Sequence, residues 1–290
     1  DATDTNLLLK AAVHRARLLI SVTDSDGTNA EVALRARQIT VQYRKEPLTC
    51  VIHIVDPQLC ALLREREINT DQNTPFRLEF FNVFEHAVRL LLRQYSPFQG
   101  DEKTGCPAHL VVVGLGKMGE SLVIQAAREW RELHGQNHTP RLRISVIDQD
   151  ALAKCESLSV RYPQLVKVCD IRPLPMNVRS AEFERGDYLF DHERKCCASA
   201  VYINLDDDSL GLHSGLVVNQ LLRHKKIPVV IRMVEETGLA TLLHQGTSHN
   251  GFENLHEFCV LDQTCTPELV LGGTHEILAR AFHEEYVRAQ

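Results

Sequence analysis

The sequence predicts an α/β protein of two similar domains with mostly parallel sheets, the first domain being incomplete. Three observations support this fold class. Short apolar runs typical of buried strands alternate with amphipathic patterns typical of helices. The alternation occurs twice, and 290 residues suit about two domains of ordinary size. A glycine-rich turn within residues 109–130 joins one strand directly to the helix that follows it.

The repeat is clearest in two segments, "RLLISVTDSDGTNAEVALRARQ" at 17–38 and "SAVYINLDDDSLGLHSGLVVNQLL" at 199–222. Each gives a strand, an acidic loop and a helix, and each is followed by a second strand and helix. When Leu18 is placed on Val201, the acids Asp24 and Asp26 match Asp206 and Asp208 with small shifts. This pattern indicates an internal duplication.

The domain boundaries follow from the repeat. Residues 1–98 form the partial first domain, which ends with a strand and a closing helix. The segment "SPFQGDEKTGCPA" has no apolar period and is a linker. Residues 107–272 form the second domain, which has an additional βαβ half before its acidic loop. Residues 273–290 form a C-terminal helix.

The stretch "HLVVVGLGKMGESLV" has the glycine spacing of a Rossmann nucleotide-binding turn. The first glycine makes the turn, the second lets a pyrophosphate approach the backbone, and the third lets the helix pack on the strand. The amino end of the following helix attracts anionic phosphate. The next strand, "LRISVID", ends in a carboxylate that can accept ribose hydroxyls and would repel a 2′-phosphate. The predicted site residues are Gly114, Leu115, Gly116, Lys117, Met118, Gly119 and Asp148.

Two features favour the alternative of a Rossmann scaffold with no ligand. Glu120 places a negative charge beside the phosphate position, although Lys117 could offset it. Asp148 follows Gly116 by about 30 residues, more than the usual 20 or so. The insertion "ELHGQNHTP" accounts for the longer spacing.

The segments "VVVGLGKMGESLV", "SVIDQD", "DAT" at the start and "VTDSDGTN" resemble RCK domains, the Trk-type (TrkA-N-like) nucleotide-binding domains of potassium channels and uptake systems. The resemblance covers nearly the whole chain as two tandem Rossmann-like copies. It implies that Asp170 lies near the adenine and the Asp206 loop near the phosphates or the nicotinamide side. The family pattern is not complete, because Cys169 replaces a glycine and Gly211 stands where the first copy has Asn29.

The resemblance also implies a function. Binding of NAD(H) or of AMP, ADP or ATP would change the domain geometry and control potassium or other cation transport. The partner would be a membrane channel or transporter, fused or separate, and a homo-oligomer is expected. The C-terminal "HEILARAFHEEYVRAQ" resembles the opening helix of a ryanodine-receptor-type repeat, and the alternative is the closing helix of the second domain.

Other functions have less support. A net charge of −6 argues against nucleic-acid binding. No apolar run of membrane-spanning length and no signal peptide are evident, so we expect a cytoplasmic protein, attached to the membrane only through a pore outside this chain. Nine cysteines without a C-x-x-C pair predict no metal site. Neither H-E-x-x-H nor G-x-S-x-G occurs, so we expect no enzyme, the alternative being an NAD-dependent oxidoreductase.

The acidic run at 206–208 has two interpretations. Clustered carboxylates could bind calcium. The more ordinary role is to cap the helix that follows, because its free amide groups accept such partners.

Overall fold

The structure is a computed structural model that describes residues 2–23, 25–43, 47–68, 75–98, 108–134, 140–190, 196–223, 225–234 and 253–264. It separates into two compact units, one from Asp1 to Val83 and the other from Phe84 to Gln263. The predicted helix at 273–290 and most of the predicted linker lie outside the described residues. The domain boundaries drawn from the sequence remain predictions.

The second unit contains a six-stranded parallel sheet in the order β6-β5-β4-β7-β8-β9. In chain order within this unit, that is the 3-2-1-4-5-6 arrangement of the doubly wound Rossmann fold. The predicted α/β class with parallel sheets is therefore confirmed. The strands are β4 (His109–Val113), β5 (Leu142–Asp148), β6 (Cys169–Pro175), β7 (Ala200–Ile203), β8 (Val229–Met233) and β9 (Leu255–Cys259).

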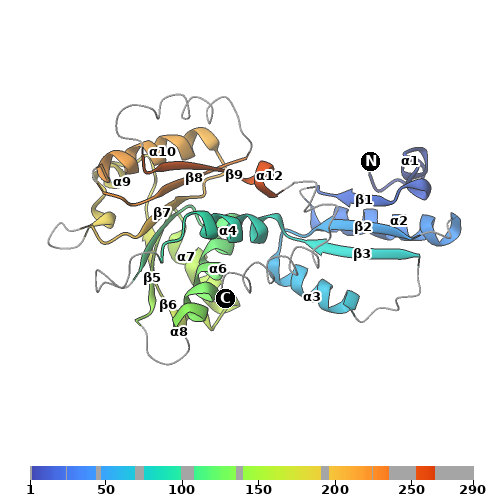
Figure 1. Ribbon diagram of the computed structural model, residues 1–290, viewed down its shortest axis with the longest axis horizontal. Coiled ribbons are helices and arrows are strands. Elements are labelled where there is room, and N and C mark those ends of the chain that lie inside the picture. The colour runs from blue at the N-terminus through green and yellow to red at the C-terminus, as the bar shows by residue number, and fades with distance from the viewer. Residues whose placement is uncertain are drawn as a thin grey trace, which may run out of the picture. The chain divides into compact units, whose positions relative to one another are not determined.

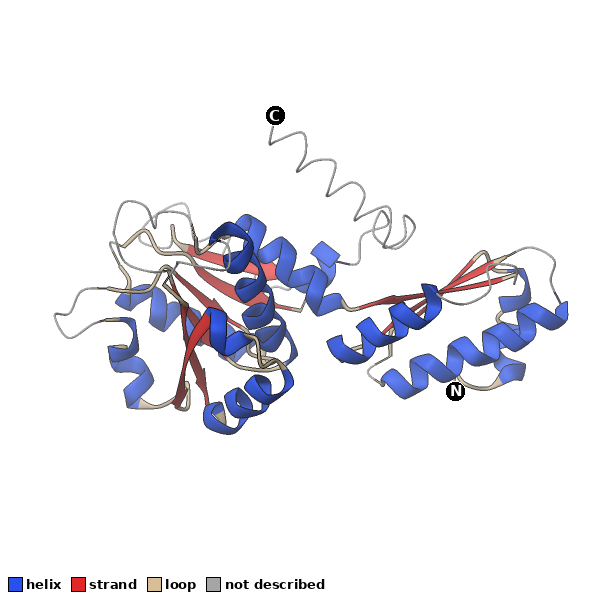
Figure 2. Cartoon of the chain, turned by 90° about the horizontal axis from the view of Figure 1, so that it is seen from below, coloured by secondary structure: helices blue, strands red, loops and turns tan. Residues whose placement is uncertain are grey.

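Helices cover both faces of this sheet (Figure 2). Helix α10 lies against one face and helices α4 and α6 against the other (Figure 1). Burial on both faces explains why all five residues of β4 are buried and why β4 lacks an alternating polar pattern. The helical segments are α4 (Val83–Gln94), α6 (Lys117–His134), α7 (Ala151–Arg161), α8 (Leu165–Val168), α9 (Ala181–Arg185), η2 (Asp187–Leu189), α10 (Asp208–Leu221) and α12 (Val260–Thr264).

The first unit contains a three-stranded parallel sheet in the order β1-β2-β3. Its apolar core includes Ala36, Ile39, Leu48, Cys50 and Ile52. The strands are β1 (Leu18–Ser21), β2 (Leu48–His53) and β3 (Phe76–Phe81). The helices are α1 (Thr5–Lys10), η1 (Val13–Arg15), α2 (Asp26–Tyr43) and α3 (Pro57–Ile68).

Each unit contains the same kind of hydrogen bond, from the backbone that follows a strand to an aspartate at the start of a helix. Asp26, the first residue of α2, accepts a 2.7 Å hydrogen bond from the N–H of Val55, just after β2. Asp208, the first residue of α10, accepts one of 3.3 Å from the N–H of Val234, just after β8. The matching strands begin at Leu18 and Ala200, so the sequence alignment of Leu18 with Val201 is wrong by one residue.

Candidate functional site

The glycine loop lies between β4 and β7, where the order in which strands are added to the sheet reverses. Chain connections run from β4 outward to β5 and from β7 outward to β8, so β4 and β7 flank the topological switch point. Ligands of open α/β sheets bind at the carboxyl ends of the strands at such a point. The loop that follows β4 and the loop that follows β7 therefore form the candidate site.

Three glycines have distinct geometric roles in the first loop. Gly114 has a φ of +89°, and a Cβ there would lie 2.8 Å from the carbonyl oxygen of Asn204. A Cβ on Gly119 would collide with the carbonyl oxygen of Gly114. A Cβ on Gly116 would meet nothing closer than a carboxylate oxygen of Asp206 at 3.8 Å. The fold therefore requires Gly114 and Gly119 and leaves the space at Gly116 open.

The amino end of α6 supplies backbone donors at this loop. The first intrahelical bond runs from the N–H of Glu120 to the carbonyl of Gly116 at 2.9 Å, so the preceding N–H groups have no partner within the helix. Lys117 is exposed here, whereas Leu115 and Met118 are buried. Of the predicted loop residues, these two therefore serve packing, whereas Gly116 is half-buried and Lys117 faces the solvent.

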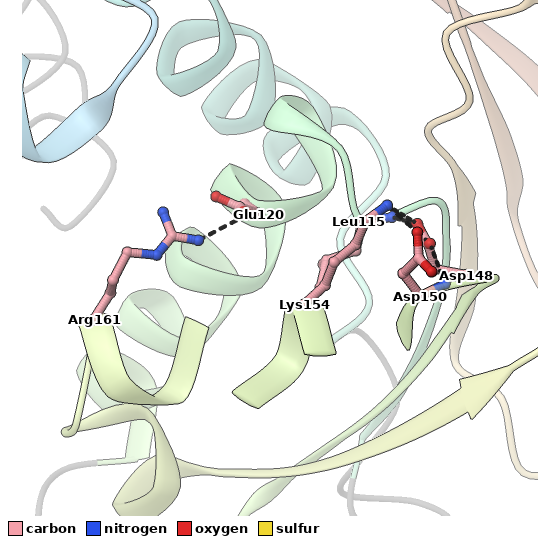
Figure 3. A network of polar contacts seen from close by, with 6 residues as sticks. All are labelled: Leu115, Glu120, Asp148, Asp150, Lys154 and Arg161. Carbon is pink, nitrogen blue, oxygen red and sulfur yellow. Dashed lines mark hydrogen bonds and ion pairs between the residues drawn. The ribbon is translucent and has the colours of Figure 1, made fainter. Parts of the chain in front are cut away.

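Asp148 ends β5 and is close to the loop, as predicted. It accepts hydrogen bonds from the N–H of Leu115 at 2.9 Å and from the N–H of Asp150 at 3.0 Å. The Nζ of Lys154 contacts both carboxylate oxygens, at 2.8 and 2.7 Å (Figure 3). A carboxylate has about four acceptor positions, and the protein itself fills all of them. A ribose diol can bind Asp148 only if Lys154 leaves.

The charge state of Asp148 follows from these contacts. Burial alone would raise the pKa of Asp148, but the hydrogen bonds from Lys154, Asp150 and Leu115 and the charge of Lys154 outweigh it. The pKa therefore lies below its ordinary value, and Asp148 is ionised at neutral pH.

Glu120 does not oppose phosphate binding as an isolated charge. Its carboxylate accepts a 2.8 Å bond from the Nη2 of Arg161, at the end of α7 (Figure 3). The sequence suggested Lys117 as the offsetting charge, and the structure provides Arg161.

The acidic run after β7 caps helix α10 and binds Arg232 on the neighbouring strand β8. Asp207 is the N-cap of α10 and accepts from the N–H of Leu210 at 3.0 Å. Asp206 pairs with the Nη1 of Arg232 at 3.0 Å, and its side chain is 90% exposed. The capping interpretation is supported, and among the described residues no group of three His, Cys, Asp or Glu side chains could hold a metal ion.

The prediction for Asp170 is wrong. Asp170 pairs with Arg143 near the amino ends of β6 and β5, whereas Asp148 pairs with Pro175 at the carboxyl ends. Five residues of extended strand separate Asp170 from Pro175, so Asp170 lies about 17 Å from the edge of the sheet that carries the glycine loop. Proline at two β6 positions disguised this strand in the sequence, and β6 tolerates proline because it is an edge strand.

Asn177, which the sequence analysis did not single out, lies at the same edge of the sheet as the glycine loop. Helix α1 is capped by Asp4 and helix α9 by Ser180, so Asp1 in the first copy corresponds to Asn177 in the second. Asn177 follows β6 at the correct edge of the sheet. Its side chain accepts from the N–H of Arg179 at 2.8 Å. In the sequence, Asn177 could have been found because it precedes the helix-capping Ser180 by three residues, as Asp1 precedes the helix-capping Asp4.

Together, the strand order and the glycine loop define the second unit as a Rossmann-type domain with the architecture of a nucleotide site. A family model described as the TrkA-N domain matches residues 1–71, which include α1 to α3 of the first unit. This match supports a TrkA-N/RCK-type domain in that part of the chain. No curated protein matches the sequence. No helix among the described residues has the length and apolar character to cross a membrane.

Proposed function

We propose that the second unit binds a nucleotide, either NAD(H) or AMP, ADP or ATP, and that the nucleotide regulates rather than reacts. The glycine loop at the switch point carries this proposal. The loop aims the free N–H groups of an 18-residue helix at the crevice. It also leaves open the one glycine position, Gly116, at which a pyrophosphate approaches the backbone.

The regulatory part rests on the TrkA-N match and on the resemblance of both copies to RCK domains. In this proposal a bound nucleotide favours one arrangement of the domains, and its difference in affinity for the two arrangements shifts their populations. The output is control of potassium or other cation transport by a membrane channel or transporter, fused or separate. Assembly into a homo-oligomer is part of the same proposal.

Thermal unfolding of the wild type and of Gly116→Ala tests nucleotide binding. A ligand at a hundred times its dissociation constant adds about 2.7 kcal/mol, and each kcal/mol raises the midpoint by about 2–4 °C. We expect NAD, NADH, AMP, ADP or ATP to raise the wild-type midpoint. Gly116→Ala should fold normally, because its Cβ has room, and should lose the shift, because the methyl group occupies the phosphate position.

Nucleotide-dependent transport is tested in cells that express the full polypeptide. Rubidium uptake should depend on the glycine loop, so Gly116→Ala should abolish any response to the nucleotide while leaving the protein folded. Uptake that responds equally in the variant would reject this part of the proposal.

A scaffold without a ligand is the second candidate, and two observations favour it. The acceptors of Asp148 are all occupied by the protein, and the exposed carboxylate of Asp206 lies near Gly116. If no nucleotide moves the midpoint of the wild type, the glycines serve helix packing alone and the scaffold is the correct interpretation.

A further inference from the structure

The amino ends of the strands in the second unit lie together at one edge of the sheet, which we call the amino edge. They share this edge because all the strand pairs of the sheet are parallel. The glycine loop follows the carboxyl end of β4 and therefore lies at the opposite edge. A strand of five residues such as β4 is about 17 Å long, so the amino edge is well separated from the candidate nucleotide site.

Exposed basic side chains are concentrated at the amino edge. Arg143 and Arg172 belong to strands β5 and β6 and not to helix ends, so complementing a helix dipole does not explain them. Among the described residues, neither has an ion-pair partner. The other exposed basic residues described at this edge are Arg131, Arg141, Lys167, Arg223, Lys225 and Lys226. The exposed acids described there are Glu132, Asp170 and Glu253, so positive charge predominates.

The opposite edge of the sheet is acidic and does not cancel this charge. It carries the exposed carboxylates of Asp150, Asp206 and Asp207. The two edges are about 17 Å apart, whereas the Debye length is about 8 Å at physiological ionic strength. A partner at the amino edge therefore meets a positive surface, although the net charge of the whole chain is −6.

Exposed aliphatic side chains lie beside the basic ones. Val160 in the last turn of α7 is 75% exposed, Leu133 in the last turn of α6 is 64% exposed, and Val166 in α8 is 51% exposed. Helix α8 contacts helix α6. The Nη1 of Arg141 donates to the carbonyl of Val166 at 3.1 Å, so a guanidinium and an exposed aliphatic residue lie side by side. Cations interspersed with exposed aliphatic groups are typical of protein surfaces that lie on a membrane.

The combination of the two kinds of side chain selects the partner. An acidic protein or a nucleic acid would satisfy the cations but would provide no apolar medium for the aliphatic groups. A bilayer with anionic lipids provides negative headgroups at its surface and an acyl boundary about 5–10 Å below. We infer that the amino edge of the second unit docks on a membrane that contains anionic phospholipids, with Leu133, Val160 and Val166 in the interface. The glycine loop then faces away from the membrane and stays open to a soluble nucleotide.

Sedimentation of the full chain with lipid vesicles tests the role of the cations. Vesicles of phosphatidylcholine and phosphatidylserine in equal parts should bind the protein, whereas vesicles of phosphatidylcholine alone should not. Arg172→Gln should weaken binding about fivefold, as expected for the loss of one cation at an anionic surface. The matched control, Arg179→Gln, removes an exposed arginine that follows the carboxyl end of β6 and should have no effect.

A second matched pair, on helix α7, tests the role of the aliphatic groups. Val160→Ser should weaken binding to the mixed vesicles about tenfold, because a hydroxyl group replaces apolar surface that enters the interface. Leu152→Ser changes a side chain that is 60% exposed in the first turn of the same helix and should have no effect. All four positions are exposed, so the unfolding midpoints should stay unchanged, which separates lost docking from lost folding.

Three results would overturn the inference. The first is a wild type that does not bind the mixed vesicles. The second is an equal effect within either matched pair. The third is binding that Arg172→Gln weakens and Val160→Ser does not, which is the result expected of a surface for an acidic protein or a nucleic acid. None of these results bears on the nucleotide test with Gly116→Ala, so the two proposals fail separately.

Discussion

Replacing Lys154 with methionine should strengthen the binding of a ribonucleotide, because this lysine occupies the carboxylate that the ribose needs. Its Nζ lies 2.7 and 2.8 Å from the two oxygens of Asp148. The side chain of Asp148 is 11% exposed and that of Lys154 is 38% exposed. A ligand with a ribose diol must break this pair, and the methionine variant has no pair to break.

The geometry sets the size of the effect. Exposed ion pairs contribute about 0.2–1 kcal/mol. Because the carboxylate is mostly buried and both of its oxygens contact Nζ, we take the upper end, about 1 kcal/mol. That free energy corresponds to a factor of about five in affinity.

The assay compares ADP with 2′,3′-dideoxy-ADP by calorimetric titration. Both ligands carry the same charge, so the loss of one positive charge from the protein affects them equally. The ratio of the two affinities should rise about fivefold in Lys154→Met. Lys167→Met, at an exposed position in helix α8, should leave the ratio unchanged. A ratio that is the same in Lys154→Met and in the wild type would refute the idea that Lys154 competes with the ribose.

Three further predictions concern stability. Gly119→Ala should cost about 2–3 kcal/mol, because its Cβ meets the backbone carbonyl of Gly114, and an unchanged thermal midpoint would contradict the close contact. His109 is buried, and burial followed by the charge of Arg143 lowers its pKa to about 4. The unfolded chain therefore binds this proton more tightly than the folded chain, and the free energy of unfolding falls as the pH drops below about 6.5. Between pH 7 and 5, His109→Asn should reduce that fall by about 2 kcal/mol, as measured by urea titration. Parallel pH profiles for the two proteins would exclude His109 as the cause. Asp26→Ala should cost about 1–2 kcal/mol by leaving the N–H of Val55 without its acceptor, and amide exchange at Val55 should accelerate.

The fold could be predicted because its signals are local. The run from Leu110 to Val113 is apolar at every position, which is typical of a strand covered on both faces. The glycines that follow mark the turn, and Asp148 closes the next strand, as the apolar pattern of that strand predicted. These features depend on neighbours in the sequence, so the sequence alone identifies them.

The contacts that decide how the site works are not local. Lys154 reaches Asp148 across a turn of two residues, because side chains of a helix point back toward its amino end. No periodic pattern marks such a pair.

The loop that follows the first strand of the first unit and the loop that follows β7 of the second unit are held by different polar contacts. In the first unit the loop after β1 is fixed by Asn29, whose Oδ1 accepts from Ser21 and Thr23 and whose Nδ2 donates to the carbonyls of Thr23 and His53. Both ends of this buried amide are therefore satisfied by hydrogen bonds within the first unit.

The equivalent loop of the second unit has lost that anchor. Gly211 replaces the asparagine, and the equivalents of Ser21 and Thr23 are the apolar Ile203 and Leu205. The loop is held instead by Arg232, which donates to the carbonyl of Leu205 at 2.8 Å and pairs with Asp206, an exposed carboxylate. Asp207 and Asp208 add hydrogen bonds to the N–H groups of Leu210 and Val234, so this loop is held by its acidic run and by Arg232 in place of a buried amide. The two loops are therefore held in different ways, from inside by a buried asparagine in the first unit and from the carboxylates and Arg232 in the second.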